Sequence, residues 1–456
     1  MYNTGAPLAD ALRAYAAKGR ASFHTPGHKG RAGLLGALEG LAFDLTELPE
    51  TGSLFDGGDV IEQAERLAAR AFGAAETLFS AGGCTLCIQT MLLLGAGAGN
   101  RVLFSRNVHR SALHAAALLG LSPEWIWPAE DGRPAAADIA EKLNKNKDIH
   151  AVYITSPDYY GRLADIPAIA AVCRTAGIPL LVDNAHGSHL GAFGLHPLTQ
   201  GAAMTADSAH KTLPVLTGGA MLHIGRWMDG NPFAGRAEAK AAMALVGSTS
   251  PSFPVLGSLD LARDWWERAG REAYRLTAGE TARLRETARK EKIGVLDGPA
   301  QDPARLTLIP GTIGVDGGDA ADYFRSQGCE PEYADAGAVV FILTPFNTPE
   351  ELTRLHGAIR GLSVALRRGR FLGRRKEAAA YTWDGDAPEI VCTPREALLA
   401  PCETVPAVRA AGRTAARAVC PCPPGIAAVA PGERITEETA RRLEQTGFDR
   451  LVVVRE

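Results

Sequence analysis

The chain has 456 residues, which is too many for a single hydrophobic core, so we expect two or three domains. Its composition, 46% hydrophobic and 22% charged, is that of an ordinary globular protein and excludes a disordered or fibrous chain. A formal net charge of −3 argues against a protein that coats nucleic acid, because such proteins need an excess of Lys and Arg. We therefore expect a small-molecule partner.

The sequence favours a cytoplasmic location. The N-terminal segment carries several charges and lacks the apolar stretch of a signal peptide. The best apolar run, residues 91–99, is half the length of a membrane span, which needs roughly 18–20 residues. We expect the eight cysteines to be reduced. The pairs Cys84/Cys87 and Cys420/Cys422 differ in spacing and lie far apart, so we expect no metal.

Between about residues 60 and 225, short β-prone apolar runs alternate with helix-like stretches. This alternation predicts an α/β domain with a mostly parallel sheet. Helices are predicted at 60–73 and 164–177, where apolar residues recur at helical spacing and the segment ends at a glycine. A long helix is predicted at 257–291, which is rich in Arg, Ala, Glu and Leu. The predicted strands cover residues 101–105, 151–157, 179–185, 204–209 and 220–224.

Residues 293–365 return to short strands and helices, which predicts a smaller α+β domain. Its strands are predicted at LTLIP, TIGV and AVVFILTP, and a helix follows residue 350. The basic run at 367–376 is interpreted as a solvated linker. The predicted parts are an N-terminal arm at 1–45, a large domain at 46–270, a small domain at 271–370 and a C-terminal domain at 371–456.

Lys211 lies between a predicted strand and a glycine-rich turn, in the segment SAHKTLPVLTGG. Ser208 and His210 beside it are polar donors suited to a phosphate, and the glycines at 218–219 allow close backbone approach. Taken alone, Lys211 could be an ordinary surface residue. Burial beside a cationic or aromatic ring would instead make its amine a nucleophile.

Asp183 ends a predicted apolar strand, 28 residues before Lys211. This distance fits adjacent strands, so both residues can lie at the carboxyl edge of one sheet, where open α/β sheets bind ligands. The carboxylate could merely cap a turn. It could also keep a pyridine nitrogen protonated, as an electron-withdrawing cofactor requires. A strand-end Asp followed by a Lys is the pattern of enzymes that use pyridoxal 5'-phosphate (PLP).

Two further turns carry candidate ligand residues. Gly83, Cys84 and Thr85 open an apolar helix, whose N-terminal N–H groups and partial positive charge suit a phosphate. The alternative is a simple helix cap by Thr85. His109, which follows the strand at 101–105, could stack on a flat cofactor ring.

In their order along the chain, these segments resemble the ornithine/lysine/arginine decarboxylases, PLP enzymes of the aspartate-aminotransferase fold (fold type I). The resemblance spans nearly the whole chain. It points to the short form of the family, because the first motif begins at Phe23 and leaves no room for the N-terminal wing domain of long members. The matching segments are FHTPGHKG, AGGCTLC, SRNVHRS, VDNAHGSH, SAHKTLPVLT, STSPSFPVLGSLDLAR, PREA and PPGIAAVAPGE.

The resemblance implies a role for each matching residue. Lys211 would carry PLP as an internal Schiff base, Asp183 would hold the pyridine nitrogen, and His109 would stack on the ring. His186 would lie near the phenolic oxygen or the substrate carboxylate. The residues implied to bind or flank the phosphate are Gly83, Cys84, Thr85, Ser208 and His210, with Ser248 and Thr249 reaching the phosphate of the other subunit of a homodimer. The implied reaction converts arginine, lysine or ornithine to the amine and CO2.

Several residues depart from the family pattern. Asn184 stands in place of an acid, Gly218 in place of a Gln, Cys422 in place of an aromatic residue and Cys84 in place of a Ser. These departures leave two alternatives open: another PLP reaction, such as transamination or elimination, and a non-catalytic protein that keeps the fold. A nicotinamide enzyme is disfavoured, because no G-x-G-x-x-G follows the first strand.

The acid that would contact the substrate side chain is not fixed by the sequence. Asp56, Asp59 and Glu433 are candidates, and each could equally serve as a turn or capping residue.

Overall fold

The computed structural model of the chain describes residues 5–17, 41–57, 60–371, 388–420, 427–445 and 447–455. Contacts between residues divide the chain into two compact units. The first unit joins residues 1–156, 165–271 and 392–399, and the second joins 157–164, 272–391 and 400–456. The division into four parts made from the sequence stays a prediction.

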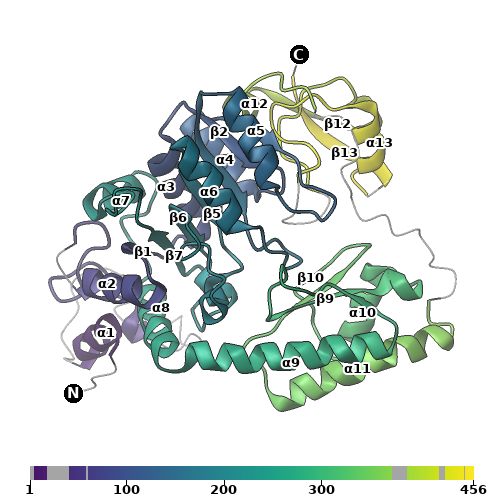
Figure 1. The fold of residues 1–456 in the computed structure, drawn as a ribbon, viewed down its shortest axis with the longest axis horizontal. Helices are drawn as coiled ribbons and strands as arrows, with labels where there is room; N and C mark the ends of the chain where they lie inside the picture. Colours follow the sequence, from purple (N-terminus) through teal and green to yellow (C-terminus); the bar gives the residue numbers. More distant parts are fainter. Residues whose placement is uncertain are drawn as a thin grey trace. The chain divides into compact units, whose positions relative to one another are not determined.

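The first unit is built on a seven-stranded sheet with the order β1-β7-β6-β5-β4-β2-β3 (Figure 1). Strand β7 is antiparallel to β1 and β6, and all other neighbours are parallel. The predicted α/β fold with a mostly parallel sheet is therefore confirmed. The strands are β1 (Glu76–Ser80), β2 (Arg101–Ser105), β3 (Ser122–Ile126), β4 (Ile149–Thr155), β5 (Leu180–Asp183), β6 (Met204–Asp207) and β7 (Ala220–Ile224).

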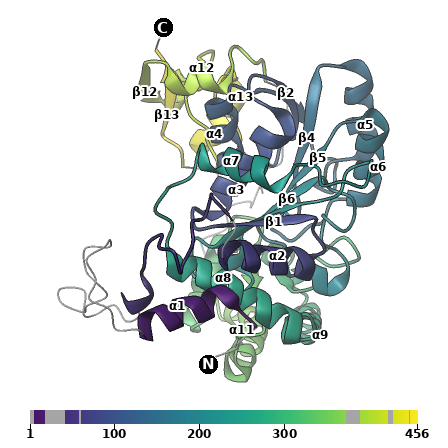
Figure 2. The same cartoon turned by 90° about the vertical axis from the view of Figure 1, so that its left-hand side faces the viewer.

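Helices cover both faces of this sheet, with α3, α4 and α7 on one side and α5 and α6 on the other (Figure 2). Helix α3 contacts the strands β1, β4, β5, β6 and β7, and α1, α2 and α8 pack against one another. The α-helices of the unit are α1 (Pro7–Ala17), α2 (Val60–Phe72), α3 (Gly83–Ala96), α4 (Arg110–Leu119), α5 (Ala136–Lys145), α6 (Ile166–Ala176), α7 (Arg236–Ala244), α8 (Phe253–Trp265) and α12 (Pro394–Leu399). The described residues of this unit also form the short 3-10 helices η2 (Leu41–Phe43), η3 (Ser188–Phe193) and η4 (Ala209–Lys211).

The helix signals read from the sequence have direct counterparts. Helix α6 begins where the Asp165 side chain accepts the N–H of Ala168, and it ends at Gly177, whose φ of 71° suits glycine. The long helix predicted at 257–291 is three consecutive segments: α8, the π-helical turn η5 (Trp266–Gly270) and α9 (Arg271–Lys290). The sequence did not predict the π turn. A Cβ on Gly270 would lie 2.9 Å from the rings of Trp265 and Trp266, so a glycine is needed there.

The second unit contains a four-stranded antiparallel sheet with the order β10-β11-β9-β8. The prediction of a strand at TIGV was wrong, because this segment lies in the 3-10 helix η6 (Pro310–Ile313) and the turn that follows. Pro310 starts that helix, and Gly314 ends it with a φ of 78°. The elements are β8 (Gly294–Val295), β9 (Arg305–Ile309), α10 (Gly317–Ser326), β10 (Tyr333–Ala334), β11 (Val339–Ile342) and α11 (Pro349–Arg367).

The basic run at 367–376 is partly built into this unit. Phe371 is buried in the hydrophobic core beside the four-stranded sheet, and the Arg370 guanidinium lies 5.1 Å from the ring centre of Tyr323. Residues 372–376 lie outside the described residues. The arginines at the described start of the run, Arg367, Arg368 and Arg370, are exposed, whereas Phe371 packs in the core.

The C-terminal residues of the second unit form a two-stranded antiparallel sheet with its own small apolar core. Its elements are β12 (Cys402–Pro406), η7 (Ala407–Arg409), α13 (Glu437–Gln445) and β13 (Arg450–Val454). Among the helices that the structure describes, none combines the length and the apolar character needed to cross a bilayer.

Candidate active site

The parallel strands of the first unit bring several predicted site residues to one edge of the sheet. Asp183 is the last residue of β5 and pairs with Thr155, the last residue of β4. His109 follows β2, His186 follows β5, and Lys211 follows β6. Because the carboxyl ends of parallel strands share an edge, these loops all leave the sheet on the same side.

Lys211 ends the short helix η4 and is half-buried. Its N–H donates to the carbonyl of Ser208, the first residue after β6, at 3.0 Å. Its Nζ lies 2.9 Å from Nε2 of His186, a side chain only 3% exposed. The amine is therefore held against the imidazole of the neighbouring strand's loop.

Asp183 is 1% exposed and engaged at both carboxylate oxygens. Oδ1 accepts the N–H of Ala185 at 3.1 Å, and Oδ2 accepts the hydroxyl of Tyr153 at 3.2 Å. Burial raises the pKa of Asp183 to about 6, although the charge of Lys211 and both hydrogen bonds act to lower it. A cationic partner would stabilise the ionised form of this buried carboxylate.

Tyr153 was not predicted as a site residue. It lies in β4, where its hydroxyl is the polar end of a side chain in a fully apolar stretch, AVYI. A buried tyrosine hydroxyl usually finds a hydrogen-bond partner, and this was the available signal. That the partner is Asp183, 30 residues away, depends on the pairing of β4 with β5 and cannot be seen in the local pattern.

His109 forms the N-terminal cap of α4. Its Nδ1 accepts the N–H of Ser111 at 3.2 Å and lies 2.7 Å from the Ser111 hydroxyl, which fixes the ring. Burial first, and then the nearby charge of Lys211, lower the pKa of His109 to about 4. The ring is therefore neutral at neutral pH, as a stacking partner for a flat heterocycle should be.

Helix α3 begins at Gly83, whose φ of 71° suits glycine. No side chain caps this helix, and Thr85 lies in its first turn, so the alternative of a simple cap by Thr85 was wrong. The N–H of Gly83 donates to the carbonyl of Gly218 at 2.8 Å. The next N–H groups of a helix have no acceptor within it, so this helix start is suited to an anion.

The Cys84 thiol interacts electrostatically with both Asp183 and Lys211. Burial raises the pKa of its thiol well above the usual value, the charge of Asp183 raises it further, and that of Lys211 lowers it. The thiol is therefore protonated at neutral pH. The N-terminus of α3 thus lies near both Asp183 and Lys211.

Gly218, which departs from the family pattern, is explained by its backbone conformation. Gly218 has a φ of 94°, a conformation that residues with a side chain rarely adopt. Its carbonyl also holds the start of α3 through Gly83. A glutamine at this position would strain the turn, so the glycine matches the conformation that the turn has here.

Ser208 and His210 lie beside Lys211 in the chain, and their role toward a phosphate stays a prediction. Ser208 is buried, and its hydroxyl lies 3.4 Å from Nδ1 of His210, which in turn lies 3.2 Å from the carbonyl of Gly219. Ser248 and Thr249 are exposed, in the connection between α7 and α8. Their role toward a second subunit stays a prediction.

The candidates for substrate recognition receive little support from their surroundings. Asp56 is exposed, whereas Glu433 is buried in the second unit and accepts the N–H of Ala430 at 2.7 Å. Asp59, Cys422 and the motif at 23–30 lie outside the described residues.

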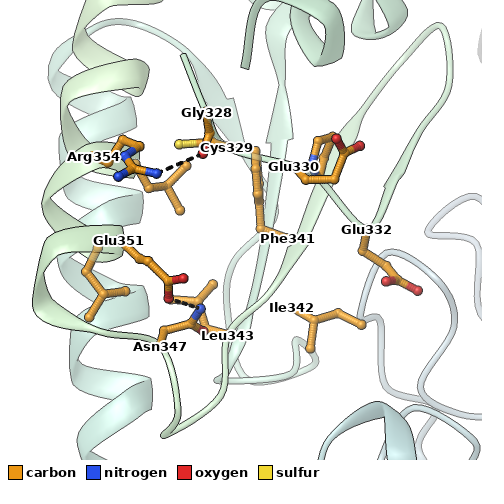
Figure 3. Close-up of a pocket in the computed structure, with 13 residues that line it drawn as sticks. Gly328, Cys329, Glu330, Glu332, Phe341, Ile342, Leu343, Asn347, Glu351 and Arg354 are labelled. Atoms are coloured by element: carbon orange, nitrogen blue, oxygen red, sulfur yellow. Dashed lines mark hydrogen bonds between the residues drawn. The ribbon is translucent and has the colours of Figure 1, made fainter. Parts of the chain in front are cut away.

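A pocket of about 430 Å³ in the second unit lies between β11, α11 and residues 328–332 (Figure 3). Two of its polar side chains make local bonds: Arg354 donates to the carbonyl of Gly328 at 3.3 Å, and Glu351 accepts the amide of Asn347 at 3.1 Å. None of the predicted cofactor residues lines it. It is therefore separate from the candidate active site.

Comparison with known families decides where the chain belongs. The family described as "Orn/Lys/Arg decarboxylase, major domain" matches residues 6–299, which is more than half of the chain. The chain belongs to the Orn/Lys/Arg decarboxylase family. The C-terminal domain of the same family matches residues 376–445. The resemblance drawn from the sequence motifs is confirmed.

Relatives within the decarboxylase family match nearly the whole chain. An arginine decarboxylase of Halalkalibacterium halodurans is 30% identical, over 94% of this chain and 91% of its own length. An arginine decarboxylase of Bacillus subtilis is 29% identical, over 95% and 91%. The structure of a lysine decarboxylase of Francisella novicida superposes with a TM-score of 0.81 at 20% identity and covers 99% of this chain and 79% of that one. This last likeness confirms the fold.

Proposed function

We propose that this member of the family is a PLP-dependent decarboxylase that converts arginine, lysine or ornithine to the corresponding amine and CO2. The observation that carries the proposal is the pairing of the Lys211 amine, 2.9 Å from His186, with the buried Asp183 at the same sheet edge. Membership in the family and the arginine and lysine decarboxylases among its relatives support the substrate class.

Three features of the site fit PLP. The Lys211 amine suits the aldehyde, and the N-terminus of α3 at Gly83 suits the phosphate. The buried Asp183 suits a protonated pyridine nitrogen, because a cation beside it would relieve the cost of burying its charge. When bound, PLP draws the electron pair left by the departing carboxylate into its protonated ring.

The residues of the chain supply orientation and proton control. Asp183 holds a proton on the ring nitrogen, and Tyr153 and Ala185 fix the position of its carboxylate. The His186 imidazole lies 2.9 Å from the Lys211 amine, within hydrogen-bond distance, and so orients that amine. His109, fixed as the cap of α4 and kept neutral, offers its ring as a flat surface. Such preorganisation is the main contribution of a protein to cofactor chemistry.

The working unit that we propose is a homodimer. Ser248 and Thr249 are exposed on the connection between α7 and α8, where their hydroxyls are available to the phosphate of a second subunit. A Ser248→Ala/Thr249→Val variant is expected to bind PLP more weakly without losing stability. Wild-type affinity in this variant would contradict the role.

The substrate class is tested with carboxyl-labelled arginine, lysine and ornithine and purified protein supplied with PLP. We expect labelled CO2 and an equal amount of amine from at least one substrate, and none from the Lys211→Ala variant. Keto-acid or ammonia in place of CO2 would identify a different PLP reaction. No turnover of any of the three would refute the decarboxylase assignment.

A further inference from the structure

A buried polar network lies at the ends of β5 and β6, beside the candidate site. Oδ2 of Asp207, the last residue of β6, accepts the side-chain amide of Asn184 at 2.9 Å and lies 3.0 Å from Nε2 of His196. Nε2 of His223, on β7, lies 3.9 Å from the same oxygen. His223 Nδ1 lies 2.8 Å from the hydroxyl of Thr77 on β1. The network thus joins four neighbouring strands.

All five side chains are at most 1% exposed, so the network is isolated from bulk water. Burial raises the pKa of Asp207, but its interactions with the other members of the network, His196 first, together outweigh burial and hold the pKa below its usual value. Burial lowers the pKa of His223 to about 4, so this ring is neutral. The network therefore has one ionised carboxylate at its centre.

Two residues of the network are next in the chain to residues of the candidate site. Asn184 follows Asp183, and its N–H continues the pairing of the strands by donating to the carbonyl of Ala206 at 3.0 Å. Asp207 precedes Ser208, whose carbonyl holds the N–H of Lys211. The Asn184–Asp207 bond therefore ties the strand end that carries the pyridine partner to the strand end that carries the amine.

Two histidines and an aspartate within 4.8 Å of one another also have the composition of a metal site. The hydrogen bonds of His196 argue against that reading. Its Nδ1 accepts the N–H of Leu198 at 3.3 Å, so in the neutral ring Nε2 carries the proton and donates it to Asp207. A ligating histidine needs the opposite arrangement, with a lone pair toward the metal and its other N–H donated.

The network also accounts for Asn184, at the position where the resemblance to the family implies an acid. An acid here would place a second carboxylate about 2.9 Å from that of Asp207, and two such groups cannot both stay ionised. An amide at 184 instead donates to the carboxylate at 207. The two residues are complementary, and their roles are exchangeable in principle, because His196 Nε2 lies 3.2 Å from the Asn184 amide as well.

We propose that Asp207 is a positioning residue of the active site. Its carboxylate, shared by Asn184 and His196, fixes the ends of β5 and β6 and thereby holds Asp183 and Lys211 at the separation that PLP requires. This inference rests on the proposed PLP chemistry and adds to it a residue pair, Asn184 and Asp207, that acts without touching the cofactor.

The test measures the dissociation constant for PLP and the unfolding midpoint in wild type, Asn184→Asp, Asp207→Asn and the double exchange. Each single variant is expected to bind PLP at least tenfold more weakly, about 1.4 kcal/mol. The double exchange restores an amide–carboxylate pair with an acceptor for His196, and its affinity is expected to return to within about threefold of wild type.

Thr205→Val is the matched control. Thr205 lies two residues before Asp207 on β6 and is equally buried, and its hydroxyl has no hydrogen-bond partner among the described residues. This variant keeps the shape of the side chain and leaves the network intact, so wild-type affinity for PLP is expected. A loss as large as that of the single variants would show a general response of β6 to substitution and overturn the proposal.

The outcomes separate this inference from the proposed function. If wild type forms no PLP absorbance band that is lost in Lys211→Ala, the proposed function fails, and this inference fails with it. If wild type binds PLP but the single variants bind equally well, or the double exchange stays as weak as the weaker single variant, only the role of Asp207 fails. Should the single variants not fold, the double exchange decides alone: wild-type affinity supports the proposal, and weak binding overturns it.

Discussion

Replacing Asp183 with asparagine measures two effects of this carboxylate: the stability that it costs the apoprotein, and the activity that it gives to the PLP-bound enzyme. Without cofactor, burial raises the pKa of Asp183 from 3.8 to about 6, against the opposing effects of Lys211, Ala185 and Tyr153. The folded protein therefore favours the neutral acid more than the unfolded chain does. Asparagine is neutral at every pH, and its one oxygen can accept the N–H of Ala185 while its amide donates to the hydroxyl of Tyr153.

The sign of the effect follows from linkage. Because the folded pKa is raised, the contribution of Asp183 to stability is fully present below about pH 4 and is lost as the pH rises through about 6. Each pH unit between the two pKa values is worth about 1.4 kcal/mol. The Asp183→Asn apoprotein is therefore expected to be about 3 kcal/mol more stable than the wild-type apoprotein at pH 8, and about half as much at pH 5.

Urea unfolding of the two apoproteins at pH 5 and pH 8 measures this difference. Asp138→Asn, at an exposed aspartate of α5, is the control and is expected to change the free energy of unfolding by less than about 0.5 kcal/mol. With PLP bound, we expect wild type to be the more stable of the two proteins. The kcat of Asp183→Asn is expected to fall roughly 10- to 100-fold, because a charged hydrogen bond is lost. An Asp183→Asn apoprotein no more stable than wild type at pH 8 would refute the reasoning.

Three further substitutions test other parts of the structure. Glu65→Ala removes a buried carboxylate 2.7 Å from the buried Lys240 ammonium, and we expect a loss of about 3–5 kcal/mol in urea unfolding; a loss below 1 kcal/mol would contradict it. Gly83 has a φ of 71°, and nothing lies within 4 Å of the Cβ that Gly83→Ala would add. This variant should therefore lose about 1–2 kcal/mol of stability from backbone strain alone, and it should bind PLP more weakly. An unchanged free energy of unfolding would count against the left-handed turn. Tyr153→Phe removes a hydrogen bond that lowers the pKa of Asp183, so the pH at which PLP affinity reaches half its maximum should rise; no shift would place the Tyr153 hydroxyl elsewhere.

Much of the fold followed from the sequence because the central strands are short, apolar and separated by regular helices. The strands predicted at 101–105 and 220–224 coincide with β2 and β7. The sheet edge that joins Asp183 and Lys211 also followed, since parallel strands present their carboxyl ends together. Four of the motifs from which the family was recognised, AGGCTLC, SRNVHRS, VDNAHGSH and SAHKTLPVLT, carry candidate residues of this site.

The parts that escaped prediction depend on partners distant in the chain. Thr77 and His223 are 146 residues apart and meet only because β1 and β7 pair. The hydroxyl of Tyr153 and the imidazole of His223 lie inside strands whose neighbours are apolar, so local pattern marks them as core residues. Strand propensity alone also wrongly predicted a strand at TIGV, where Pro310 begins a 3-10 helix and Gly314 ends it.

In the function that we propose, Lys211 carries the cofactor. Incubating the protein with PLP, reducing it with borohydride and sequencing its peptides by mass spectrometry locates the modified lysine directly. We expect a single phosphopyridoxyl group on the peptide that contains Lys211, and its loss when arginine, lysine or ornithine is added in excess before reduction. A modification on another lysine, or none at all, would contradict the account.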